Sequence, residues 1–261
     1  MTSADDADRH VEIWPPSARI DLPLYWALLA SIVSSEHSAV VRSSFLLLLA
    51  ALGATSAAAA PPAAFERYGN VYYRAVDGTV RQLTHGGNYG EPSLSPDERT
   101  VAFIREDSKS NVEGESGRTS LWVADGVSGT IRKLLSPNPR DEAERNLESF
   151  GNPIFSLDGG YVYVEAEAWA TSHAIHQVSV ATGKKHFVVG GSLHGILRNG
   201  PYRGYLVVNE HRYHPAPEFG SYDPDFIIRP DGKEILRVPG TEMNDGHDRL
   251  FDWLRIKGWR L

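Results

Sequence analysis

Cysteine is absent from this chain of 261 residues, and only two methionines occur. Without a thiol the protein has no disulfide, no thiolate nucleophile and no cysteine ligand for a metal. The absence of disulfides leaves the cellular compartment open, because exported proteins without them are common. Hydrophobic residues make up 41% of the sequence, an ordinary share for a protein that buries a core.

Basic residues are outnumbered, with 26 Lys and Arg against 33 Asp and Glu and a formal net charge of −7. Residues 61–261 carry 23 basic and 27 acidic side chains, so this imbalance is mild there. A mildly acidic surface has no electrostatic reason to bind nucleic acid or an anionic membrane. We therefore expect no nucleic-acid partner.

Catalytic motifs are also lacking. The string G-x-S-x-G, which places a serine nucleophile on a strained turn, does not occur. The carboxylates are spread over loops, and no pair has an apolar setting that would make one of them an acid. The sequence thus predicts no catalytic residue, no cofactor-binding residue and no cofactor, and favours a non-catalytic protein.

A long apolar run is missing, but a short one lies in residues 41–60. Arg42 precedes an apolar run from Phe45 to Leu52, and an alanine tract follows. This order is typical of a secretory signal peptide, and the apolar core is about nine residues long where a membrane span needs about 20. We predict a signal peptide over 41–60, cleaved after Ala59, a periplasmic or secreted product, and no membrane span after cleavage.

The predicted signal begins unusually far from Met1. We interpret residues 1–40 as a non-native leader, with translation starting at Val40 or Val41. The leader contains an apolar segment at 22–33 that is too short to span a membrane. Residues 61–261 then form the mature domain.

From Phe65 onward, short alternating apolar runs are separated by Gly, Asp and Pro, which is typical of strands joined by tight turns. Four such stretches align on a turn glycine with separations of 51, 54 and 49 residues, a near-constant period that indicates repeated structural units. Glycine is suited to these turns because it tolerates positive φ. The four glycines are Gly78, Gly129, Gly183 and Gly232.

A second element recurs between these predicted hairpins, at residues 91–106, 152–167 and, more weakly, 196–211. In the first two copies, Pro, Ser and Asp stand at matching offsets before an alternating strand. Each unit therefore contains about four strands, two from this element and two from the glycine-turn hairpin. A four-stranded unit is the blade of a β-propeller.

The string that contains the first copy of this element resembles the repeat of TolB-like propellers, the WD40-like PD40 repeat, in which Q-L-T precedes a proline and then S-P-D-G. The matching residues are Gln82, Leu83, Thr84, Pro92, Ser95, Pro96 and Asp97, while Glu98 replaces the usual glycine. The second copy keeps Pro153, Ser156, Asp158 and Gly159 but has Leu157 in place of proline. The resemblance covers residues 66–190 well and 190–240 loosely.

The predicted fold is all-β, a propeller-like array of about four four-stranded units, with a C-terminal helix as one option. TolB-like propellers usually have six blades, which at about 45 residues each exceeds the length left after the signal. The array is therefore a small ring, an open fragment or half of an assembly. Residues 245–261 form either a helix, with Leu250, Trp253 and Leu254 on one face, or a strand pair that completes the hairpin at 71–84.

Two polar segments, 107–119 and 137–149, interrupt the repeats. We expect them to be solvated surface loops, with a partner-contacting rim as the alternative.

Two H-x-x-H pairs, His173 with His176 and His211 with His214, are the candidates for metal binding. On a strand, positions i and i+3 point to opposite faces, so such a pair cannot chelate one ion. In a loop it can, but zinc generally needs a third protein ligand. Structural histidines are therefore the default. Metal binding is the alternative, because oligogalacturonate lyases resemble TolB-like propellers and use a histidine-bound metal.

Aromatic residues gather in 201–224, around an irregular loop at 211–225. Exposed aromatic and arginine side chains are typical anchors of protein interfaces. The predicted partner contacts are Arg212, Tyr213, Phe219 and Tyr222. The alternative is that this segment is only a long ordered loop between strands.

Three functions are consistent with these patterns. The first is an exported, non-catalytic propeller module that binds a protein or cell-envelope component. The second is a metal-dependent enzyme acting on a polysaccharide. The third is a truncated remnant of a larger propeller protein.

Overall fold

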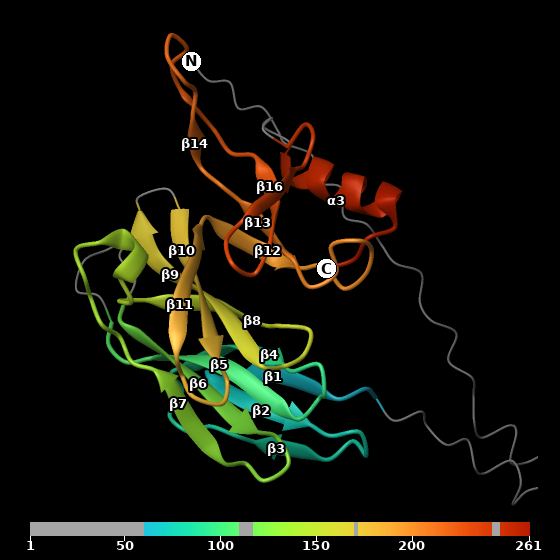
Figure 1. The fold of residues 1–261 in the computed structure, drawn as a ribbon. Coiled ribbons are helices and arrows are strands. Elements are labelled where there is room, and N and C mark those ends of the chain that lie inside the picture. Colours follow the sequence, from blue (N-terminus) through green and yellow to red (C-terminus); the bar gives the residue numbers. More distant parts are fainter. Residues whose placement is uncertain (1–59, 110–116, 170–171, 242–245) are drawn as a thin grey trace, which may run out of the picture. The chain divides into compact units, whose positions relative to one another are not determined.

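A computed structural model describes residues 60–109, 117–169, 172–241 and 246–261, all within the compact unit Ala58–Leu261 (Figure 1). The predicted leader and signal peptide lie outside the described residues, apart from Ala60. Within the described part, no helix is long and apolar enough to cross a membrane.

Four antiparallel sheets follow one another along the chain, confirming the all-β array of repeated units (Figure 1). The first contains β1 (Ala63–Arg67), β2 (Asn70–Arg74) and β3 (Val80–Gln82). The second contains β4 (Tyr89–Leu94), β5 (Thr100–Glu106), β6 (Thr119–Asp125) and β7 (Ile131–Leu135). The third contains β8 (Phe150–Phe155), β9 (Tyr161–Trp169), β10 (Ser172–Ser179) and β11 (Lys185–Gly190).

The fourth sheet contains β12 (Ser192–Ile196), β13 (Leu206–Asn209), β16 (Asp225–Ile228) and β17 (Glu234–Arg237). A separate two-stranded sheet, β14 (Arg212–Tyr213) with β15 (Ser221–Tyr222), is inserted between β13 and β16. No described sheet closes on itself. The first sheet has three strands among the described residues, where about four were expected in each unit.

The four predicted hairpins are the last two strands of each four-stranded sheet, together with β2–β3 of the first. Their turn glycines have φ values of +83° at Gly78, +77° at Gly129, +69° at Gly183 and +87° at Gly232. These angles are disfavoured for residues with a Cβ, which is why glycine marks each turn.

The Ser-x-Asp strings form a second kind of turn, which joins the first two strands of the second and third sheets. The Ser156 hydroxyl donates to Asp158 (2.6 Å) and accepts from the amide of Tyr161 (3.0 Å). Ser95 makes the corresponding contacts with Asp97 and with the amide of Thr100. The repeated sequence element is therefore a repeated hydrogen-bonded turn.

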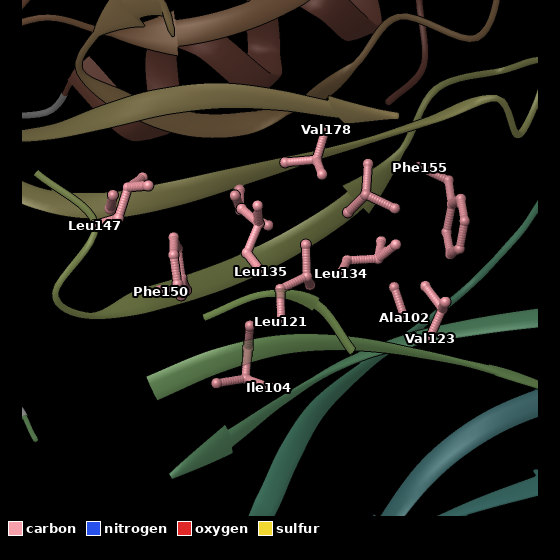
Figure 2. Close-up of a cluster of buried hydrophobic side chains, with 13 residues drawn as sticks. Ala102, Ile104, Leu121, Val123, Leu134, Leu135, Leu147, Phe150, Phe155 and Val178 are labelled. Carbon is pink, nitrogen blue, oxygen red and sulfur yellow. The ribbon is translucent and has the colours of Figure 1, made fainter. Parts of the chain in front are cut away.

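Each sheet packs on the next through a buried apolar cluster. Val71 and Tyr73 of the first sheet, with Leu83 directly after its last strand, pack against the second sheet. Figure 2 shows the cluster between the second and third sheets, where Leu121 and Phe150 are among the buried residues. A further cluster joins the third and fourth sheets.

The segment at 137–149 is only partly a solvated loop. It contains a short 3-10 helix, η1 (Ala143–Arg145), and a bridge between Asn138 and Leu147. The Leu147 side chain is 1% exposed and belongs to the cluster of Figure 2. The expectation of a solvated segment was wrong at this residue. In the other polar segment, 107–119, residues 110–116 lie outside the described part of the structure.

The C-terminal segment forms a helix, α3 (Gly246–Lys257). Leu250 and Leu254 are buried against Val207 and Ile227 of the fourth sheet. The alternative of a C-terminal strand pair completing the first hairpin was wrong, because β1 supplies the additional strand of that sheet.

Candidate functional site

The inserted hairpin β14–β15 contains the residues that the sequence singled out as partner contacts. Arg212 pairs with Tyr222, and Tyr213 pairs with Ser221. The segment was expected to be an irregular loop, so this pairing is a correction. In Figure 1 the hairpin extends beyond the end of β13.

The base of the hairpin is held by charged and aromatic contacts. Arg212 donates through Nε to Oε2 of Glu210 (2.7 Å), forms an ion pair with Glu234 and lies over the ring of Phe226, 5.0 Å from its centroid. Burial raises the pKa of the Glu210 carboxyl, and the hydrogen bond from Arg212 acts in the opposite direction by lowering it. Arg212 therefore anchors the hairpin to the fourth sheet.

Tyr222 is also held at the base. The ring of His214 stacks on it with a centroid distance of 4.5 Å, and the guanidinium of Arg237 lies 5.3 Å from its centroid. The tip is different, since Phe219 is 95% exposed and Tyr213 is 73% exposed. Of the four predicted contact residues, two fix the hairpin and two project into solvent.

The histidine candidates do not converge. His173 and His176 both lie on β10, where His173 is exposed and His176 is buried. His211 and His214 each face a carboxylate instead, with Nδ1 2.6 Å from Asp223 and 3.3 Å from Glu218 respectively. Among the described residues, no three His, Asp or Glu side chains are arranged to hold a metal ion.

His176 is chemically unusual. Neither ring nitrogen has a hydrogen-bond partner, and the ring meets that of Phe187 edge-on at 5.9 Å. Burial lowers the pKa of this imidazole to about 4, helped by the positive charges of Lys185 and His186. The ring is therefore neutral at physiological pH and packs as part of the core.

A cavity of about 570 Å³ lies where the second and third sheets meet the β1–β2 turn. Among the described residues, five carboxylates and no lysine or arginine line it. The carboxylates are those of Glu66, Glu91, Glu106, Glu165 and Glu167. The exposed His173 also lines it, so the cavity has an acidic wall with one imidazole.

Two residues link the first strands of successive sheets beside this cavity. Glu91 on β4 accepts a hydrogen bond from the amide of Asn152 on β8 (2.5 Å). Asn152 in turn donates to the carbonyl of Leu193 on β12 (2.8 Å). Both have positive φ, +51° and +50°, and both precede a proline.

Sequence reasoning missed this cavity and its links. The available signal was the repeated G-x-P string, Gly90-Glu91-Pro92 and Gly151-Asn152-Pro153, of which only the prolines were used. The cavity itself is formed by three sheets, so no local string encodes it.

No protein-family model matches the chain, and no curated protein sequence matches it. Solved structures do resemble it. Dipeptidyl peptidase 4 from Porphyromonas gingivalis has a TM-score of 0.51 at 12% identity, over 69% of this chain and 31% of that one. The chain therefore spans about a third of that protein, and at this identity the likeness concerns the fold alone.

Two further structures are more distant. The β-propeller domain of the Trilobed protease from Pyrococcus furiosus has a TM-score of 0.42 at 15% identity, over 64% of this chain and 47% of that one. TolB from Acinetobacter baumannii has a TM-score of 0.41 at 15% identity, over 65% and 37%. The fold defines the protein as a propeller-type array of antiparallel sheets, and membership of the TolB-like family stays a prediction.

Proposed function

We propose that this protein is an exported, non-catalytic propeller module that binds a protein or cell-envelope component through the hairpin β14–β15. The observation that carries this is the exposure of Phe219 and Tyr213 at the tip of a hairpin whose base is fixed. Large aromatic side chains are frequent anchors of binding energy, and a rigid base lowers the entropy lost on binding.

The hairpin is an insertion, which supports a role beyond folding. The corresponding connection in the third sheet, between β9 and β10, spans only residues 170–171. The four strands of the fourth sheet pair without the hairpin, since β13 pairs directly with β16. The pairing of the fourth sheet therefore does not determine which residues stand at the tip of the hairpin, and binding to a partner can determine them.

The binding site is tested by photo-crosslinking in cells. A photoreactive phenylalanine analogue replaces Phe219 in one variant and Val127, 54% exposed in the β6–β7 turn, in the control. We expect a discrete crosslinked product from position 219 that is absent from position 127. Replacing Tyr213 with Ala in the first variant should reduce its yield. Equal products from both positions contradict the proposed surface.

Export is tested separately, by fractionation and by sequencing the N-terminus of the native product. We expect the mature chain to begin at Ala60 and to leave the cytoplasm. A cytoplasmic protein that retains residues 41–59 contradicts the export part of the proposal and leaves the hairpin test unaffected.

A further inference from the structure

Among the described strands, the first sheet lacks one that the second and third sheets have. In each of the second and third sheets, the glycine-turn hairpin is preceded by two more strands, giving the order β4-β5-β6-β7 and its equivalent. In the first sheet, the hairpin β2–β3 has only β1 beside it among the described strands. The position next to β1 corresponds to that of β4 and β8.

The edge of β1 with which no described strand pairs presents backbone hydrogen-bonding groups to which an added strand can pair. β1 joins β2 through a two-residue turn at 68–69, with φ values of +52° and +66°. In such a hairpin the pair flanking the turn is hydrogen bonded and the pattern then alternates, so Arg67 and Phe65 bond to β2. The N–H and C=O groups of Ala64 and Glu66 therefore point to the other edge, where no described strand pairs with them.

The two sides of this edge differ in chemistry. On one side, the Glu66 carboxylate lies over Gly90 of β4, and a Cβ at position 90 would be 3.0 Å from Oε2 of Glu66. Glu66 also lines the cavity, whose other carboxylates include Glu91 and Glu106. On the other side, the ring of Phe65 stacks on that of Tyr72, with centroids 5.5 Å apart and planes 11° apart. One side carries the carboxylates, and the other carries the ring pair of Phe65 and Tyr72.

We propose that β1 binds an extended peptide as an added strand, and that this peptide alternates basic with apolar side chains. In strand addition the main-chain ladder supplies affinity and alternate side chains supply specificity. Successive side chains of a strand point to opposite faces, so the basic ones reach Glu66 and the cavity while the apolar ones pack on Phe65 and Tyr72. The site stands apart from the hairpin β14–β15 and from export.

The test uses the full chain and a fluorescent octapeptide of alternating Lys and Val, with binding followed by fluorescence anisotropy. Two matched peptides separate the contributions. One replaces every Lys with Glu, and the other keeps all side chains but carries N-methyl groups on alternate backbone amides. We expect binding of the Lys-Val peptide, with each comparison peptide bound about tenfold more weakly or less.

Protein variants test the same edge from the other side. Ala64→Pro removes an amide that points outward and leaves the β1–β2 bonds in place, whereas Ala64→Val keeps that amide. We expect Ala64→Pro to weaken binding of the Lys-Val peptide about tenfold. The Ala64→Val variant should bind this peptide as tightly as the parent protein does. Glu66→Gln should weaken it several-fold, with the loss diminished at high salt.

Contrary outcomes are clear. A full chain that binds none of the peptides, or that binds the N-methylated peptide as well as its parent, overturns the proposal. Equal binding by Ala64→Pro and Ala64→Val does the same. Because the N-methylated peptide changes the ligand alone, this arm holds even where Ala64→Pro unfolds the protein. The crosslinking test at position 219 is unaffected by any of these results.

Discussion

At the residue scale, the repeated turns show how sequence and backbone conformation correspond. Glu98 occupies the position where the second copy has Gly159, and both have positive φ, +61° and +72°. The flanking Ser-x-Asp hydrogen bonds hold the conformation in both copies. Residues with a Cβ are strained in this region of the Ramachandran plot. Glu98 is therefore tolerated because its neighbours fix the turn.

This equivalence gives a matched pair of substitutions. Glu98→Gly should stabilise the protein by about 1 kcal/mol, because relief of strain exceeds the added entropy of the unfolded chain. Gly159→Ala should destabilise it by about 1 kcal/mol for the opposite reason. Denaturant unfolding of the two variants and the parent measures both. Changes of the same sign in both variants contradict this account.

The buried His176 predicts how stability depends on pH. Its pKa is about 4 in the folded protein, below the usual 6.5, so the unfolded state binds the proton more readily between these values. Stability is full above pH 6.5 and falls as the pH drops toward 4, by roughly 3 kcal/mol from this group. In His176→Leu this part of the pH dependence should disappear from thermal unfolding curves. His173→Leu, at an exposed position of the same strand, should leave it unchanged.

At the scale of the element, hairpins were more predictable than connections. The four turn glycines determine their hairpins locally, because a positive φ between two alternating runs leaves few other structures. Leu147 was not predictable from its polar surroundings, since its burial depends on a cluster that forms only when the second and third sheets pack together. The cavity was missed for the same reason, because Glu66, Glu91 and Glu165 come from three different sheets.

Leu147 should behave as a core residue despite lying in a polar connection. Leu147→Ala removes a side chain from the cluster of Figure 2 and is expected to cost about 3 kcal/mol of unfolding free energy. Arg140→Ala, an exposed position in the same segment, should change it by less than about 0.5 kcal/mol. Chemical denaturation measures both. Equal, small effects show that the segment does not contribute to the core.

At the scale of the whole described domain, each sheet covers a face of its neighbour. The fourth sheet packs on the third through one cluster and is covered by α3 through another, which contains Leu250 and Leu254. A propeller-type array of this kind needs such cover, because a bare apolar sheet face associates with other molecules. The sequence allowed the helix but left its position open, since amphipathicity specifies which face is buried and not what it is buried against.

Weakening the packing of α3 should therefore promote self-association. The double variant Leu250→Ala with Leu254→Ala is expected to lose about 4 kcal/mol of stability and to expose the fourth sheet. Size-exclusion chromatography with light scattering should then show oligomers that increase with concentration. The Ile256→Ala variant, altered at a position of α3 that is 75% exposed, should keep the association state of the parent protein. A double variant that is destabilised but stays in the parent's association state shows that α3 contributes packing energy without protecting the sheet from other molecules.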